Sequence, residues 1–268
     1  METSSASLAK EPANNLIDPL TSQESTNHLT HPPPSSHLAP DRDAGLWIPD
    51  YSGDQQIVDQ LEHSGDAWCC KVFAQEQLCI VLGKGCDAKR DLHLDVVQRE
   101  QIPLYRRQGG GGTVVLAPGM LIVAVAAYLS DPFGNKRYFH LIQTPLQEAL
   151  VSDGIGDVVQ RGMSDLAIDG RKILGSSLRR QRHLLVYQAV LLVDAARDLF
   201  GRYLQHPPRE PDYREGREHR DFTTNLRERG LQSDLFALQT RLQSHLSLRL
   251  PVLLAADLLD PSVVRGGC

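Results

Sequence analysis

Apolar residues recur along this chain with the periods of helices and of strands. Ile57, Val58 and Leu61 lie at helical spacing in a polar background, which predicts a short amphipathic helix. Two shorter apolar runs follow, Ala67–Ala74 and Leu78–Leu82, separated by a polar Gln-Glu-Gln turn. We expect these two runs to pair with each other as strands around that turn.

A longer apolar run, Met120–Leu129, consists almost entirely of aliphatic and small residues and shows no alternation with polar ones. Such a run predicts a central strand that is buried on both faces. A helix over about 89–100 is predicted before it and another over 137–152 after it. Pro145 either kinks the second helix or marks its true start.

The second half of the chain is predicted to contain hairpins and then helices. Asp169-Gly170 is a type I′ turn signal, because both residue types tolerate the positive φ that this turn requires. Hairpins are frequent and no regular βαβ rhythm occurs, so we predict an α+β fold around a mixed, mostly antiparallel sheet with flanking helices. The expected elements are strands over 158–160, 165–168, 172–178 and 184–193 and helices over 195–204 and 234–248.

The composition changes at both ends of this pattern. Residues 1–44 are rich in Ser, Pro, Asn and Thr and contain no aromatic residue. Such a segment buries too little apolar surface to offset its ordering entropy, so we expect a disordered N-terminal tail. Residues 45–250 are then predicted to form one domain, which is a usual domain size. Residues 251–268 are expected to form an apolar C-terminal tail.

Charge and cysteine usage exclude several classes of protein. The formal net charge of -5 gives no bulk attraction to nucleic acid or to an anionic membrane. The five cysteines include no Cys-x-x-Cys pair and no disulfide-like spacing, which disfavours a zinc site and indicates a reducing compartment. No apolar stretch has the length of a signal peptide core or of a membrane span. We therefore expect a soluble cytoplasmic protein.

Residues 106–115, Arg-Arg-Gln-Gly-Gly-Gly-Gly-Thr-Val-Val, carry the first candidate chemistry. Four consecutive glycines have a large entropic cost, and between two strands they indicate a close approach to the backbone. Glycine N–H groups can form an anion nest, and guanidinium groups bind phosphate or carboxylate. Neither a Walker A loop nor a Rossmann fingerprint fits the spacing. The stretch predicts a loop for a phosphate or an acyl phosphate; the alternative is a flexible hairpin tip with two solvated arginines.

Residues 165–177, Asp-Leu-Ala-Ile-Asp-Gly-Arg-Lys-Ile-Leu-Gly-Ser-Ser, form the second informative stretch. Taken alone, a lysine just after a hairpin turn is typical of a solvated strand end. Together with the arginine–glycine loop, however, the pattern resembles the lipoate–protein ligase family, whose relatives are the biotin–protein ligases and the octanoyl transferases. The resemblance extends from about Asp54 to Leu248.

The resemblance implies a class II synthetase-like fold and a two-step reaction. A lipoate or octanoate carboxylate attacks the α-phosphate of ATP, and the acyl adenylate then acylates a lysine on a carrier domain. The implied carriers are a glycine cleavage H protein or a dehydrogenase E2 domain. Mg²⁺ would neutralise the departing pyrophosphate. Many complete ligases carry a C-terminal accessory domain, which this chain is too short to include. It therefore needs a separate accessory subunit, is self-sufficient, or uses a preformed acyl adenylate.

The resemblance also assigns roles to residues. Lys172 is the expected catalytic residue and bridges the acyl carbonyl and the phosphate, while Asp165 helps to hold the metal or orients the lysine. Arg107 is expected to contact the phosphate. Three positions depart from the family pattern: Ser164 replaces an Asn, Val115 an aromatic residue and Leu116 a His. The full expected binding set is Arg107, Gly110, Gly111, Gly112, Thr113, Val114, Val115, Asp165 and Lys172.

Two other functions compete with the ligase. An ATP-independent octanoyl or lipoyl transferase needs an activated thiolate near the lysine. The loop over 160–164, where such relatives place it, has no cysteine, so Cys79 or Cys86 would have to fold back toward the site. A non-catalytic ligand-binding homologue is the third candidate, and the intact Arg107 and Lys172 argue against it.

Three further stretches have two interpretations each. The run Met120–Ala127 lines a tunnel for an eight-carbon chain, forms plain core, or does both on opposite faces. The charged segment 209–217 is a loop over the active site or a surface crosspiece held by ion pairs. A basic cluster docks an acidic carrier domain or is a solvated face; its members are Arg179, Arg180, Arg182 and His183.

Overall fold

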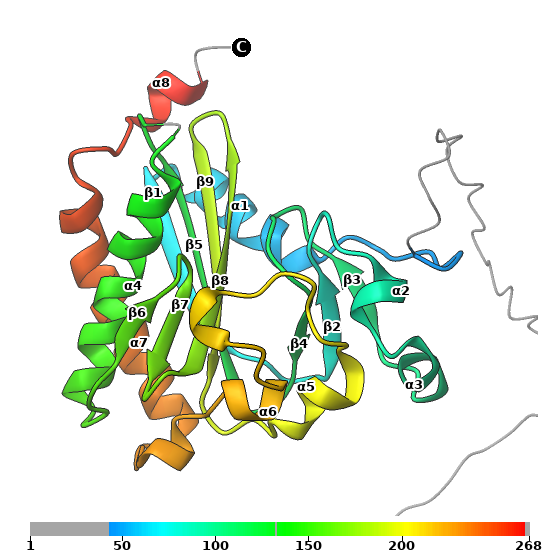
Figure 1. Ribbon diagram of the computed structural model, residues 1–268. Helices are drawn as coiled ribbons and strands as arrows, with labels where there is room; N and C mark the ends of the chain where they lie inside the picture. The colour runs from blue at the N-terminus through cyan, green and yellow to red at the C-terminus, as the bar shows by residue number, and fades with distance from the viewer. Residues whose placement is uncertain (1–42, 132, 266–268) are drawn as a thin grey trace, which may run out of the picture. The chain divides into compact units, whose positions relative to one another are not determined.

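A six-stranded antiparallel sheet contains the longest strands of the protein (Figure 1). The structure is a computed structural model that describes residues 43–131 and 133–265, so the expected tail of residues 1–44 lies almost wholly outside the described residues. In spatial order the strands of the large sheet are β1 (Trp68–Ala74), β5 (Met120–Tyr128), β9 (Leu184–Leu192), β8 (Arg171–Gln181), β7 (Asp165–Ile168) and β6 (Val159–Arg161).

A second sheet contains three short strands in the order β3 (Leu104–Arg106), β2 (Cys79–Leu82) and β4 (Val114–Leu116). Strand β2 pairs parallel with β3 and antiparallel with β4. The predicted mixed, mostly antiparallel α+β architecture is therefore confirmed, with its strands divided between two sheets.

The predicted hairpin between β1 and β2 is wrong. All seven residues of β1 pair with β5 instead, while β2 crosses to the small sheet. Pairing with β5 places Cys70 and Val72 in the main core, and the four residues of β2 are buried between β3 and β4. Both strands thus bury their apolar residues with partners that are distant in sequence.

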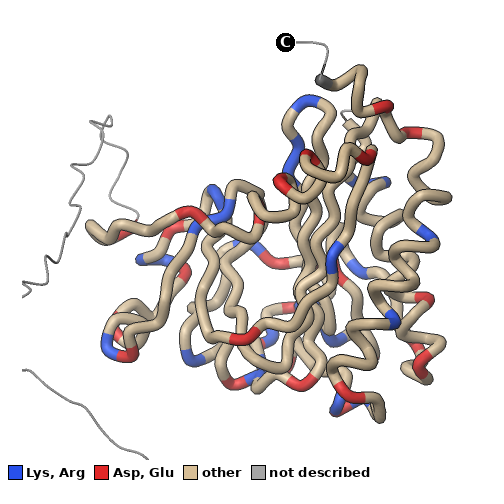
Figure 2. The backbone as a smooth tube through the Cα atoms, turned by 180° about the vertical axis from the view of Figure 1, so that it is seen from behind, with Lys and Arg blue, Asp and Glu red and all other residues tan. Residues whose placement is uncertain are grey.

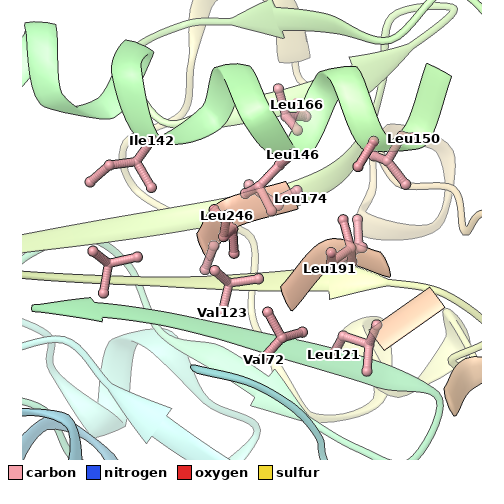
Figure 3. Close-up of a cluster of buried hydrophobic side chains, with 14 of the residues drawn as sticks. Val72, Leu121, Val123, Ile142, Leu146, Leu150, Leu166, Leu174, Leu191 and Leu246 are labelled. Carbon is pink, nitrogen blue, oxygen red and sulfur yellow. The ribbon is translucent and has the colours of Figure 1, made fainter. Parts of the chain in front are cut away.

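Two long helices cover one face of the large sheet, α4 (Asn135–Ser152) and α7 (Leu235–Leu254) (Figure 1). Figure 3 shows Leu146 of α4 and Leu246 of α7 directed toward the strands, together with Val123 of β5. All nine residues of β5 are buried, as its unbroken apolar run predicts. Helix α7 continues past the predicted end at residue 248, because leucines at four-residue spacing remain buried along it: Leu238, Leu242, Leu246, Leu250 and Leu254.

The predicted helix over 89–100 is also wrong. The chain forms two short helices, α2 (Ala88–Asp91) and α3 (Leu94–Arg99). Between them Leu92 forms a bridge with Leu204, and the His93 N–H donates to the Tyr203 carbonyl oxygen at 2.9 Å. These bonds to a distant segment replace the intrahelical bonds that a continuous helix requires.

The opposite face of the large sheet is covered by helix α1 (Ser52–Ser64) near β1 and by the small sheet. Short elements complete the fold: α5 (Asp198–Tyr203), α6 (His219–Phe222), α8 (Pro261–Arg265) and the 3₁₀ turns η1 (Asp212–Arg214) and η2 (Arg227–Arg229). Pro145 lies within α4, so it does not mark that helix's start. No helix among the described residues is both long enough and apolar enough to cross a bilayer.

Candidate active site

The Asp169-Gly170 turn joins β7 to β8 and sets the position of Lys172. The φ angles of Asp169 and Gly170 are 48° and 68°, so both residues have the positive φ of the predicted type I′ turn. Strand β8 begins at Arg171, and Lys172 is its second residue.

A β-bulge in this hairpin decides the direction of the lysine. Leu166 pairs with Leu174, but the next residue, Ala167, pairs with Lys172, so Ile173 is an extra residue on β8. Both Ile173 and Leu174 are buried in the main core. Residues three apart on a regular strand face opposite sides, and the bulge removes this opposition. Lys172 therefore shares a face with Gly175 instead of entering the core.

The Lys172 ammonium is held between a carboxylate and a glycine. Its Nζ lies 2.8 Å from Oδ1 of Asp165, whose side chain is only 7% exposed, while the lysine side chain is 29% exposed. Asp165 pairs across the strands with Gly175. A methyl group at position 175 would lie 2.6 Å from Nζ, so any residue other than glycine there would make the lysine side chain shift. Lys172 is thus placed by its neighbours and retains a route to solvent.

Tyr213 completes the environment of Asp165. Its hydroxyl donates to Oδ2 at 2.9 Å, so both carboxylate oxygens have a partner. Burial and the neighbouring Asp165 raise the pKa of Tyr213, which keeps the hydroxyl protonated as a donor. Arg217 donates to the Gly170 carbonyl oxygen at 3.0 Å, and Tyr213 and Pro211 lie beside Gly162. The segment 209–217 therefore lies across the lysine hairpin, which favours the interpretation as a loop over the active site.

Arg107 is buried inside the glycine loop, with 5% of the residue exposed. Its Nε and Nη2 donate to the Gly110 carbonyl oxygen at 3.1 and 2.8 Å, and Nη2 also donates to that of Gly112 at 2.7 Å. Nη1 lies 3.4 Å from the Val81 carbonyl oxygen. Burial lowers the pKa of Arg107, and these carbonyl dipoles replace the water that the cation has lost. The alternative of two solvated arginines on a flexible tip is therefore wrong.

The loop packs closely on the turn that follows β2. A methyl group at Gly83 would overlap the Gly111 carbonyl oxygen, and Gly111 itself has a φ of +89°. Lys84 N–H donates to the Gly109 carbonyl oxygen at 3.0 Å. Glycine is therefore required at position 83 for close approach and at position 111 for its backbone conformation.

The carbonyl and amide groups of the loop have different partners. The Gln108 N–H donates to the buried Asp54 carboxylate at 3.1 Å, and burial raises the pKa of Asp54. Within residues 43–131 and 133–265, the N–H groups of Gly110, Gly111 and Gly112 donate to no protein acceptor. Three amides in a row without a protein partner form the kind of nest that receives an anion.

The structure brings the glycine loop and the lysine hairpin to the same strand face. A methyl group at Gly109 would lie 3.8 Å from Ser177 Oγ, and one at Gly111 would lie 3.8 Å from Ser177 Cβ. Ser177 follows Gly175 by two residues on β8, so both face the same way, about 6.6 Å apart along the strand. The loop contacts β8 at Ser177, and the Lys172 ammonium lies over Gly175.

The other expected binding residues have mixed positions. Thr113 Oγ1 donates to Asp91 Oδ2 at 3.0 Å, so its side chain ties the end of the loop to helix α2. Val114 and Val115 belong to β4, and the Val115 side chain is buried in the second core. The Val115 side chain therefore faces away from any ligand, and Val114 is only half-buried.

A resident metal site does not fit the protein ligands present. The described residues contain no group of three or more His, Cys, Asp or Glu side chains that could hold an ion. Both oxygens of Asp165 are bound, one to Lys172 and one to Tyr213. Of its two expected roles, the geometry favours orienting Lys172.

One cysteine does approach the site. Cys86 donates from Sγ to the Gly111 carbonyl oxygen at 3.4 Å, and burial raises the pKa of Cys86. Burial also raises the pKa of Cys69 and Cys79 to about 11 and that of Cys70 above its ordinary value. The four described cysteines are therefore neutral thiols at pH 7, which does not suit a nucleophile.

The basic cluster lies near the tip of the β8–β9 hairpin, where Figure 2 shows Lys and Arg positions together. Arg180 points to the helical side, where its guanidinium lies 5.3 Å from the Tyr138 ring centroid and donates to the Asp131 carbonyl oxygen. Arg182 and His183 are exposed. A carrier-docking role for this tip stays a prediction, and Arg180 has a structural role in addition.

Sequence comparison identifies the family. The family model for the lipoyl protein ligase A/B catalytic domain matches residues 53–247, which include both motifs. The chain belongs to this family. It is 30% identical over 99 residues to a lipoate–protein ligase of Streptococcus pyogenes, which covers 37% of this chain and 28% of that protein. It is 30% identical over 125 residues to an octanoyltransferase of Gloeobacter violaceus, which covers 45% of this chain and 53% of that protein.

Solved structures share the fold. The chain aligns with a bipartite lipoate protein ligase of Thermoplasma acidophilum, described with its E2 lipoyl domain, at a TM-score of 0.63 and 20% identity over 76% of this chain and 82% of that one. It also aligns with a lipoate–protein ligase A bound with ATP. The TM-score is 0.60 and the identity 18%, over 76% of this chain and 84% of that one. At these identities the likeness shows the fold alone. The chain also spans about half or less of the length of the two curated relatives that it matches.

Proposed function

We propose that this protein is an ATP-dependent lipoate–protein ligase that forms lipoyl-AMP, or octanoyl-AMP, and transfers the acyl group to a lysine of a carrier domain. Membership of the lipoyl protein ligase A/B family supports an enzyme of lipoylation. The observation that carries the proposal is Lys172, which the bulge places on the face that the glycine loop contacts. A solved neighbour with bound ATP and another described with a lipoyl domain are consistent with these substrates.

The first step needs fixed positive charge. A carboxylate oxygen of the acid attacks the α-phosphorus of ATP, the bond to the bridging oxygen breaks, and pyrophosphate leaves. Two anionic groups approach each other, so a preorganised cation lowers the barrier as charge develops on the phosphoryl oxygens. Lys172 supplies that cation when its ammonium moves from Asp165 to the ligand. The amides of Gly110–Gly112 supply neutral donors to the phosphate without adding repulsion among cations.

The second step uses the same groups. The carrier lysine amine attacks the acyl carbon, the bond to the AMP oxygen breaks, and the amine releases its proton to solvent. Negative charge grows on the acyl carbonyl oxygen in the transition state, where Lys172 stabilises it. Arg107 acts through the loop: its guanidinium binds the Gly110 and Gly112 carbonyl groups and so directs the intervening amides outward. The resemblance implies that Arg107 contacts the phosphate directly. In this structure its guanidinium binds the loop carbonyl oxygens instead, so we assign it this indirect role.

The competing function is an octanoyl transfer between carriers without ATP, and the Gloeobacter relative favours it. That reaction passes through a thioester on an activated cysteine. Cys86 is the described cysteine at the glycine loop, and its pKa is raised by burial. A neutral buried thiol supports the ligase over the transferase.

Mass spectrometry of a carrier domain tests the proposal. The full chain is mixed with lipoate and a glycine cleavage H protein or an E2 lipoyl domain, with and without Mg·ATP. We expect the carrier to gain one lipoyl group only when the nucleotide is present. Acyl transfer from an octanoylated carrier without nucleotide would instead establish the transferase, and no modification in either arm would favour the non-catalytic homologue.

The Cys86→Ala variant sharpens this test. A ligase that uses no thioester should retain carrier acylation within about twofold of the wild type, because the thiol donates only one weak hydrogen bond to the loop. A transferase that used Cys86 would lose its activity. The variant Cys79→Ala, at a buried thiol at the start of β2 and away from the loop, controls for effects of cavity formation.

A further inference from the structure

Four residues form a continuous row across the face of the large sheet that lies opposite α4 and α7. Lys71 of β1 pairs with Ala124 of β5, Ala124 pairs with Gln188 of β9, and Gln188 pairs with Ser177 of β8. Adjacent strands lie about 4.8 Å apart, so this row spans about 14 Å. That length is enough to run beneath an extended eight-carbon chain together with its carboxyl group.

Gln188 is the unusual member of this row. Its amide nitrogen is buried and has no hydrogen-bond partner in the protein. A buried donor left unpaired costs about 1–3 kcal/mol, and nearly all buried polar groups have a partner. The described residues offer the Gln188 amide nitrogen no acceptor. An unpaired donor on the face of the lysine and the glycine loop therefore points to an acceptor that a ligand brings.

The neighbours of Gln188 indicate which part of a ligand it meets. On one side Ser177 touches the glycine loop, where the phosphate is proposed to bind. On the other side Ala124 lines a small cavity of about 30 Å³, whose wall combines the apolar Phe73 and Ile57 with the polar Gln56, Gln60 and Lys71. Gln188 thus lies between the glycine loop and a cavity whose wall is apolar in part. In an acyl adenylate the group between the phosphate and the chain is the carbonyl.

Lys172 reaches the same region. Its ammonium lies over Gly175, which pairs with Val190, the residue two positions after Gln188 on β9. Gly175 and Gln188 are therefore diagonal neighbours, about 7–8 Å apart. Two long side chains from these positions can meet one atom placed between them.

We propose that Gln188 donates its side-chain N–H to the carbonyl oxygen of the acyl substrate and acts there as a second donor beside Lys172. This inference rests on the proposed acyl-adenylate chemistry and adds a residue to it. The ligand class is an apolar carboxylic acid and its acyl adenylate. Gln188 holds the carbonyl in line with the phosphate in the first step and stabilises the oxyanion in the second.

Paired ligands test the contact directly. Octanoyl-sulfamoyladenosine retains the acyl carbonyl, whereas octyl adenylate has a methylene in its place. Calorimetry is carried out with the wild type and with Gln188→Leu. We expect the variant to bind the carbonyl ligand about three- to tenfold more weakly, the range of one neutral hydrogen bond. Its affinity for octyl adenylate should stay unchanged.

Stability supplies the second readout. Gln188→Leu removes a buried unpaired donor, so its Tm should equal or exceed that of the wild type. The matched control is Gln143→Leu, because Gln143 is buried and donates to Ser176 Oγ at 3.2 Å on the helical side. That control should lower the Tm and affect both ligands equally.

The outcomes separate this inference from the proposed function. If the wild type acylates a carrier and binds both ligands, but Gln188→Leu binds octanoyl-sulfamoyladenosine equally well, the carbonyl contact is wrong and the ligase stands. A Tm loss matching that of Gln143→Leu would likewise assign Gln188 a structural role. If the wild type binds neither ligand and acylates no carrier, both proposals fall.

Discussion

The glycine loop and the lysine hairpin each contain a cation, and the protein treats the two cations differently. Arg107 is 5% exposed, and its guanidinium binds the neutral carbonyl oxygens of its own loop. Lys172 has a side chain that is 29% exposed, and it binds a single carboxylate. The first cation is a permanent part of the backbone scaffold, whereas the second can exchange its partner for a ligand.

The difference shows that the type of partner decides what a cation in a site can do. Several carbonyl groups around one guanidinium fix its orientation. If the guanidinium left these carbonyl groups, it would be a buried charge without solvation. A lysine beside one carboxylate near solvent loses little when an anionic ligand takes the place of that carboxylate. Two positive residues that look alike in sequence are therefore expected to respond differently to mutation.

The largest effect on activity is expected at Lys172. Lys172→Ala should lower the rate of carrier acylation at least about a hundredfold, because it removes a preorganised charge at the transition state. Its Tm should change by only a few degrees, since the lysine end of the pair is 29% exposed and Tyr213 still donates to the Asp165 carboxylate. Rates from carrier mass analysis and Tm from calorimetry test this, with Lys136→Ala at the exposed start of α4 as the control. A fully active Lys172→Ala protein would remove the central assignment.

At Arg107 we expect a large effect on stability, in contrast to Lys172, where the large effect is on activity. Arg107→Ala should destabilise the protein by about 3 kcal/mol, because the carbonyl groups of the loop lose a buried charged donor. Arg107→Lys should not restore stability, since an ammonium cannot reproduce the fork that spans Gly110 and Gly112. Denaturant unfolding measures both variants. An unchanged midpoint in Arg107→Ala would show that the guanidinium does not support the loop.

The packing of the loop is tested by two nearby glycines. Gly83→Ala places a methyl group against the Gly111 carbonyl oxygen and should destabilise the protein by about 1–3 kcal/mol while raising the KM for ATP. Gly85→Ala meets no atom within 4 Å and should leave both quantities unchanged. Equal behaviour of the two variants would contradict the close packing of the loop on the β2 turn.

The smallest effect is expected at Tyr213. Tyr213→Phe leaves Oδ2 of the buried Asp165 without its donor and should lower stability by about 1 kcal/mol. Activity should fall by a few fold, because Lys172 remains in place on the other oxygen. Tyr105→Phe, at a half-buried tyrosine away from the hairpin, is the matched control. If both variants unfold at the wild-type temperature, Tyr213 does not support Asp165.

Local patterns predicted the parts of the fold that depend on local physics. The unbroken apolar run of β5, the Asp169-Gly170 turn and the apolar face of α4 are all present as expected. These features follow from side-chain periodicity and from the φ preferences of single residues, which act within a few positions of the chain. For the same reason both functional motifs could be recognised from consecutive residues.

Choices between distant partners were not predictable in this way. Strand β1 was expected to pair with β2, and the helix over 89–100 was expected to be continuous, but long-range contacts prevailed in both places. Asp54 and Tyr213 were missed because each meets its partner about fifty residues away, the Gln108 amide and the Asp165 carboxylate. The lone tyrosine in the charged segment 209–217 was the only available signal for the second.

The sequence by itself determined which residues carry charge, which segments form strands and helices, and where glycine opens the backbone. Tertiary structure alone decided that a bulge at Ile173 turns Lys172 out of the core and that Arg107 turns into its own loop. It also decided that the Gln188 amide meets no protein acceptor. Each of these depends on which strands pair and in which register, and register is set by the burial of whole faces and not by any single residue.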